Sequence, residues 1–228
     1  TRLAQGAYPG NSMDQVKWVG TIGADYGVIA VAGDSDVVTL GELLENLKSK
    51  PKKWVIGGGS AVGGWDHLKV LMAAKEYGIS NVRKIKYVSF DGGGDAVTQL
   101  LAGNVQIFTG DVSEIKGFVD AGDIKIIAVL SPDRLPGDFS KFYTAREQGV
   151  NVVGANWRGF YVPKGMSDDA YNFWAGAIKK MYDTPQWKKT MAKNGLAPLD
   201  LSGKAFEGFV ANSVASIQTI SKQIGIIK

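Results

Sequence analysis

The middle of the chain repeats one pattern three times: an apolar run, a glycine-containing turn, and an amphipathic segment with helical spacing. The runs are residues 54–56, 85–90 and 105–108, and the turns are residues 57–64, 91–94 and 109–111. Strands that alternate with single short helices are typical of right-handed βαβ units. The sequence therefore predicts an α/β fold with a mostly parallel sheet. In such a sheet the three turns leave the same carboxyl edge, and three helix N-termini converge there.

Helix boundaries follow from capping signals. Asp66 opens the first of these helices, Asp95 is the predicted N-cap of the second, and Ser113 that of the third. Thr39 with Glu42 forms a predicted capping box for a helix over residues 39–47. Further helices are predicted over 168–182, with Tyr171, Trp174, Ile178 and Met181 buried, and over 184–193 and 206–224. Strands are predicted over 16–21, 28–32, 124–130 and within 151–163.

Composition excludes several classes of function. The chain has no cysteine and one histidine, His67, which excludes disulfides, thiol catalysis and a multi-histidine metal site within one chain. The net charge of +4 comes from scattered residues, which disfavours nucleic acid as a partner. The apolar runs are much shorter than the roughly 18 residues of a membrane span. We therefore predict no metal, no cofactor and no nucleic acid.

The turns match no standard phosphate or catalytic motif. Val62 and Val97 stand where a dinucleotide-binding turn needs its third glycine. Residues 59–64 have P-loop spacing, but Trp65 follows in place of lysine. A nucleophile elbow needs glycine two residues after Ser60, and that position is also valine. What remains is glycine backbone beside helix N-termini, an arrangement that suits an anion such as a carboxylate.

Each of these features also has a purely structural interpretation. The glycines are common turn residues. Ser60 is a backbone cap or a ligand contact rather than a nucleophile, and His67 forms a local hydrogen bond or contacts ligand. Asp66, Asp95 and Asp111 are ordinary acids at helix starts and would repel an anion unless they face the backbone. Trp65 and Trp157 are either the walls of a cleft or part of the core.

Several stretches together resemble one family of receptors. They are WVIGGGSAVGGWDHLKVL at 54–71, IKYVSFDGGGDAVTQLLAG at 85–103, residues 105–122, IIAVLSPDRLPG at 126–137, NWRGFYVPKGM at 156–166 and MAKNGLAPL at 191–199. In this order they resemble the extracytoplasmic solute-binding receptors of tripartite tricarboxylate transporters, and the resemblance covers essentially the whole chain.

The resemblance implies a type II periplasmic-binding-protein fold, in which two α/β lobes are joined by hinge strands and enclose the ligand. Residues 1–29 and 156–228 would form a partial first lobe, and residues 30–155 the second. The implied function is capture of a small di- or tricarboxylate, such as citrate, in the periplasm for delivery to the membrane permease subunits. The implied ligand-binding residues are Gly58, Gly59, Ser60, Gly63, Gly64, His67, Phe90, Gly92, Gly93, Asp95, Thr109 and Asp111, with Ala24, Tyr26 and Trp157 near the hinge strands.

One departure from the family concerns the start of the chain. Members open with a further strand, loop and helix series in the first lobe, and that series is missing before Thr1. The expectation is a truncated first lobe with exposed apolar faces, which favours self-association.

Two other functions remain open at this point. One is a ligand sensor that reports to a signalling partner. The other is a small-molecule enzyme on a similar fold, with Asp66, His67 or Asp111 as acid–base groups. The sequence shows no catalytic triad and no metal cluster, which disfavours the enzyme.

Overall fold

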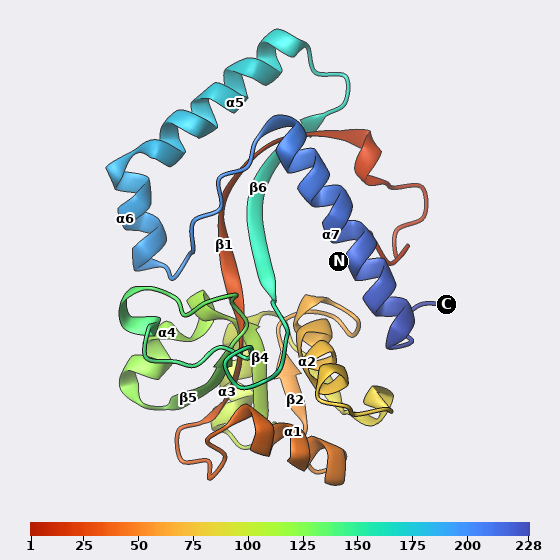
Figure 1. Ribbon diagram of the computed structural model, residues 1–228, viewed down its shortest axis with the longest axis vertical. Helices are drawn as coiled ribbons and strands as arrows, with labels where there is room; N and C mark the ends of the chain where they lie inside the picture. Colours follow the sequence, from red (N-terminus) through yellow and green to blue (C-terminus); the bar gives the residue numbers. More distant parts are fainter. The chain divides into compact units, whose positions relative to one another are not determined.

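A mixed sheet forms the centre of the larger part of the chain (Figure 1). Its strand order is β3-β2-β4-β1-β5, and β6 pairs with β1 outside that path. The strands are β1 (Val16–Ala32), β2 (Ile56–Gly58), β3 (Tyr87–Ser89), β4 (Ile107–Asp111), β5 (Ile124–Val129) and β6 (Ala155–Pro163). The computed structural model describes all residues from Thr1 to Lys228.

The prediction of a mostly parallel sheet is only partly right. Strand β2 is parallel to both β3 and β4, as βαβ units require. Strand β1, however, is antiparallel to both β4 and β5 and lies between them. A helix over Leu40–Ser49 connects β1 to β2 in the chain, but the two strands run in opposite directions, so the rule that makes successive strands parallel does not hold at β1.

Seven α-helices accompany the strands. They are α1 (Leu40–Ser49), α2 (Trp65–Glu76), α3 (Gly93–Leu101), α4 (Val112–Ala121), α5 (Asp168–Asp183), α6 (Pro185–Lys193) and α7 (Gly203–Gln223). The predicted capping box of α1 is confirmed, since the Thr39 hydroxyl accepts from the Glu42 amide. All four leucines on its inner face are buried. No helix combines the length and the apolar character that crossing a bilayer requires.

The chain divides into two compact units. Unit 1 contains Thr1–Asp25, Trp157–Gln223 and Ile227–Lys228, and unit 2 contains Tyr26–Asn156 and Ile224–Ile226. The chain passes from one unit to the other within β1 and within β6. The lobes predicted from the sequence had their boundaries at residues 29 and 155.

The two predicted strands at 16–21 and 28–32 are in fact one strand of 17 residues. Its glycine-containing middle stays extended because its backbone groups find partners. Ala24 exchanges two hydrogen bonds with Ala197, and the Gly27 amide donates to the Gly154 carbonyl at 2.8 Å. The apolar sequence pattern is interrupted at these glycines, but the hydrogen bonds keep the backbone in one continuous strand.

Most of the aromatic residues of α5, in unit 1, are not buried. Trp174 was predicted to be buried and is 50% exposed, with the neighbouring Phe173 67% exposed. Their rings pack against each other, with centroids 5.5 Å apart. Tyr182 is the buried residue of this 16-residue helix. Helical spacing identified an apolar face, but no other element of the unit covers its outer part.

Candidate functional site

Three strand-to-helix connections, two of them turns, meet at the carboxyl edge of the parallel strands in unit 2. Residues 59–64 connect β2 to α2, residues 90–92 connect β3 to α3, and β4 runs directly into α4. A Cβ atom on Gly59 would lie 2.6 Å from the backbone of Gly92 and Gly93, and one on Gly58 would lie 2.7 Å from the Thr109 carbonyl oxygen. The predicted convergence of the turns is confirmed, and only glycine permits so close an approach.

The first turn is held together by its own polar groups. The Ser60 hydroxyl accepts from the Asp66 amide at 3.0 Å, which caps the first turn of α2. Gly63, at a φ of +79°, donates its amide to Nδ1 of His67 at 3.0 Å. The Tyr87 hydroxyl donates to the Ser60 carbonyl at 2.7 Å. The structural interpretations of Ser60 as a cap and of His67 as locally bonded are both confirmed.

His67 is a neutral group in this setting. Its ring stacks on Tyr87 with centroids 4.4 Å apart, and burial lowers its pKa to about 4. Because Nδ1 accepts a hydrogen bond, the proton of the neutral ring is on Nε2. Burial also raises the pKa of Tyr87 to about 12. At neutral pH neither side chain is poised to exchange a proton.

The second turn leaves the start of α3 uncapped. Gly92 is the N-cap, at a φ of +113°, and has no side chain to offer. Asp95 was predicted as this cap, which is wrong, because the helix begins at Gly93 and Asp95 is an exposed residue of its first turn. The amides of Gly93, Gly94 and Asp95 donate no hydrogen bond within the protein. These three amides have no partner within the protein; Gly94 and Asp95 are exposed, whereas Gly93 is buried beside the Glu114 carboxylate.

The start of the third helix, α4, is capped by side chains at its own N-terminus. Residues 109–111 were predicted as a turn but form the end of β4, and Asp111 rather than Ser113 is the N-cap of α4. Asp111 and Glu114 make a capping box, in which the Asp111 amide donates to the Glu114 carboxylate at 2.8 Å. Of the three N-termini, α3 alone has an entirely uncapped first turn.

A buried lysine lies between two of the predicted site aspartates. Lys69 on α2 is completely buried, and its Nζ lies 2.9 Å from Asp66 and 2.7 Å from Asp111. It also donates to the Gly110 carbonyl at 2.6 Å, and the Asn156 amide donates to the second oxygen of Asp111. Burial disfavours the charged amine, but the carboxylates of Asp111 and Asp66 outweigh burial and raise the Lys69 pKa.

The lysine changes what the aspartates can do. The sequence interpretation required these acids to turn away from an incoming anion, towards the backbone. Asp111 does face the backbone, as the N-cap of α4, but both Asp66 and Asp111 also turn towards Lys69, which offsets one of their two negative charges. Two glycines make room for its aliphatic stem. A Cβ atom on Gly27 would lie 2.5 Å from Lys69 Cδ, and one on Gly154 would lie 3.1 Å from it.

Sequence reasoning missed Lys69. Lysine is usually exposed, so its type gives no indication that it lies in the core. The available signal was the spacing of Asp66 and Lys69, which places opposite charges three residues apart on a helix.

Two of the predicted ligand residues belong to unit 1. The Ala24 amide and carbonyl are both bonded to Ala197. Trp157 packs edge-on against Trp18, Phe206 and Phe209 in an aromatic cluster.

The remaining aromatic candidates lie in unit 2. Tyr26 and Phe90 are half-buried, and the Phe90 amide donates to the Gly58 carbonyl. Trp65 is also half-buried, and its indole N–H has no partner. Ligand roles for all the predicted site residues stay predictions.

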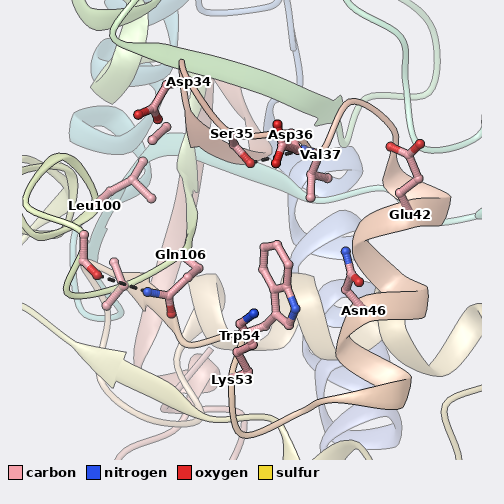
Figure 2. A pocket seen from close by; sticks show the side chains of 13 residues that line it. Asp34, Ser35, Asp36, Val37, Glu42, Asn46, Lys53, Trp54, Leu100 and Gln106 are labelled. Carbon is pink, nitrogen blue, oxygen red and sulfur yellow. Dashed lines mark hydrogen bonds between the residues drawn. The ribbon is translucent and has the colours of Figure 1, made fainter.

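A pocket of about 540 Å³ lies elsewhere in unit 2 (Figure 2). Trp54, two residues before β2, and Gln106, directly before β4, line it together with Glu42 and Asn46 of α1. It therefore adjoins the amino ends of β2 and β4, whereas the glycine turns follow the carboxyl ends. None of the predicted site residues lines it. No cluster of three His, Asp or Glu side chains is arranged to hold a metal ion.

Comparison with known proteins relates this geometry to a family. Residues 7–226 match the model of the tripartite tricarboxylate transporter family receptor. A relative from Cupriavidus necator, the UPF0065 protein in gbd 5'region, is 23% identical over 206 residues, which are 90% of this chain and 61% of the relative. The chain spans about three-fifths of the length of the curated relatives it matches.

Solved structures share the fold. Rpa4515 of R. palustris with adipate gives a TM-score of 0.82 at 20% identity, covering 92% of this chain and 69% of that one. MatC of Rhodopseudomonas palustris with bound malate gives 0.76 at 17% identity, covering 100% and 75%. These similarities confirm the predicted two-lobe α/β fold.

Proposed function

This chain belongs to the family of tripartite tricarboxylate transporter receptors, and we propose that it is a solute-binding protein for small carboxylates. The observation that carries the proposal is the uncapped first turn of α3, which lies against the glycine turn that follows β2. Backbone amides at a helix N-terminus, together with the partial positive charge there, suit a carboxylate ligand.

The start of α3 can contribute part of the free energy of ligand binding. One helix N-terminus contributes up to about 2 kcal/mol in a partly buried setting. Micromolar binding needs about 8 kcal/mol. The three free amides of α3 add hydrogen bonds to a charged group, each contributing roughly 1.5–3 kcal/mol. The positive charge of the helix end and these hydrogen bonds arise from the same amides and do not add in full, so α3 supplies a large share of the required free energy without a cationic side chain at the ligand.

Lys69 makes this arrangement compatible with an anion. Asp66 and Asp111 both hold the lysine ammonium, so their carboxylates are engaged inside the protein. If they faced the ligand, each would repel it, since like charges at short range are unfavourable. We infer that the buried ion cluster is the reason that Asp66 and Asp111 are tolerated beside a carboxylate site. Glu114 lies beside Gly93, and burial raises its pKa, which favours its neutral form.

We propose di- or tricarboxylates as the ligand class, with delivery to membrane permease subunits from the periplasm. Family membership supports the receptor role, and the adipate and malate in two structural neighbours support the chemistry of the ligand. We propose no catalytic step. His67 is neutral and locally bonded, and the two buried aspartates are held by Lys69, so the acid–base groups that an enzyme would need are engaged.

Thermal unfolding with a carboxylate panel tests the proposal. Adipate, malate and citrate are each added at millimolar concentration, with adipamide as a neutral control of matched shape and sodium chloride as the ionic-strength control. A ligand at a hundred times its Kd stabilises the native state by about 2.7 kcal/mol. For a chain of this size, that raises the Tm by roughly 5–10 °C. Failure of every carboxylate to shift the Tm, or an equal shift with adipamide, would contradict the proposal.

A further inference from the structure

Seven basic side chains gather on two neighbouring segments of unit 2. We call them the basic edge: Lys48, Lys50, Lys52, Lys53, Arg83, Lys84 and Lys86. The segments lie side by side, because the Ile56 amide donates to the Lys86 carbonyl, and Lys84 lines a pocket of about 590 Å³ with Lys50, Lys52 and Lys53. All seven residues are exposed. No acidic residue occurs within 48–53 or 83–86.

Most of this charge is not neutralised by the protein. Several bases elsewhere are paired with acids: Lys116 and Lys179 each hold two aspartates, and Arg134 holds Glu147. On the basic edge, Lys48 alone has an acidic neighbour, Glu45 at 3.9 Å. Seven positive charges here exceed the net charge of +4 of the whole chain, so the remainder is net negative. The positive field is therefore concentrated on one edge.

We propose that the basic edge is an electrostatic docking surface for an anionic lipid bilayer. Clusters of four to eight lysines or arginines are typical of surfaces that bind anionic headgroups. The composition favours lipid over an acidic protein partner. Protein interfaces are enriched in aromatic residues and arginine and depleted in lysine. Six of the seven residues here are lysines, and no large exposed apolar side chain lies within either segment.

The position of the edge suits such a role. Lys53 precedes β2 and Lys86 precedes β3, so the basic residues flank the amino ends of these strands. The glycine turns follow the carboxyl ends of the same strands. Headgroups bound at the basic edge would leave the turns unobstructed. Figure 2 shows Lys53 and Trp54 at this amino-end side, on the wall of the neighbouring pocket.

Vesicle co-sedimentation tests the inference. The wild-type chain is compared on phosphatidylglycerol–phosphatidylcholine vesicles and on pure phosphatidylcholine vesicles, at low and at molar salt. The test variant carries K50Q, K52Q, K53Q and K84Q. A matched control carries K188Q, K189Q, K193Q and K204Q, which are exposed lysines of unit 1. Both variants have a net charge of 4 − 4 = 0. Circular dichroism and thermal unfolding establish that both are folded.

We expect the wild type to bind the anionic vesicles alone and to release them at molar salt, where the Debye length is about 3 Å. Each lysine near the surface contributes roughly fivefold to partitioning, so the test variant should lose at least about tenfold and the control much less. Three results would overturn the proposal: no binding of the wild type to anionic vesicles, equal losses in the two variants, or binding to polyglutamate in the absence of vesicle binding. The last result would assign the edge to an acidic polypeptide instead.

Discussion

The ammonium of Lys69 lies 2.7 Å from a carboxylate oxygen of Asp111, at a depth where the lysine has no contact with solvent. The pair connects α2 to the start of α4, and Asp66 and Asn156 complete the cluster. Each of these groups depends on the others, because a buried charge without its partner is strongly unfavourable.

Replacing Lys69 with methionine should therefore destabilise the protein by about 3–5 kcal/mol. The variant keeps most of the side-chain volume but leaves two carboxylates without their cation. Lys75→Met, an exposed position on the same helix, is the control and should change stability by no more than about 0.5 kcal/mol. Urea unfolding measures both. Equal stability of the two variants would show that the cluster contributes little.

Gly27→Ala should destabilise the protein by about 1–3 kcal/mol. The added methyl group would lie 2.5 Å from Lys69 Cδ, and the three hydrogen-bonding partners of Nζ prevent the lysine from moving aside. Gly41→Ala on α1 is the control, since nothing lies within 4 Å of its Cβ position. Alanine there should stabilise the helix by up to about 1 kcal/mol. An unchanged free energy of unfolding in Gly27→Ala would mean that the aliphatic part of Lys69 can move aside.

His67 should make stability depend on pH in a defined direction. Its pKa is about 4 in the folded protein, against about 6.5 when unfolded, so the unfolded state binds more protons between these values. The free energy of unfolding therefore falls as the pH drops through this window, by about 2 kcal/mol from neutral pH to about pH 4.5. His67→Gln retains an acceptor for the Gly63 amide and should remove this part of the dependence. The chain has no other histidine, so parallel pH profiles for the two proteins would refute the assignment.

The free amides of α3 can be tested one at a time. Gly94→Pro removes one donor, and proline is tolerated in the first turn of a helix. Gly94→Ala keeps the donor and meets no neighbouring atom within 4 Å. For a carboxylate that shifts the Tm of the wild type, the proline variant should weaken binding roughly ten- to a hundredfold, while the alanine variant binds normally. Calorimetric titration measures the difference. Equal affinities would place the ligand elsewhere.

Local signals predicted much of the fold. The capping box of α1 depends on residues three apart, and the glycine turns follow short apolar runs, so both are visible in the sequence. The meeting of the turns also followed correctly from the parallel order of β2, β3 and β4. These features need no knowledge of distant contacts.

The features that the sequence predicted wrongly or not at all depend on tertiary contacts. The continuity of β1 depends on Ala197 and Gly154, which are far away along the chain. The burial of Lys69 depends on Asp111 and on space left by two glycines in other segments. Asp95 satisfies the rule for an N-cap, but the turn at Gly92 starts the helix three residues earlier than that rule predicts. Residue preferences describe neighbours in sequence, whereas these outcomes are decided by neighbours in space.

The backbone at Gly92 has an evolutionary consequence. At a φ of +113°, a serine or aspartate at this position would be strained, so the usual substitution that steadies a helix start is disfavoured. Evolution of a more stable protein would therefore have to change the conformation of the whole turn before a side chain at this position could cap α3. The conformation of the main chain, and not only the absence of a side chain, keeps the start of this helix uncapped.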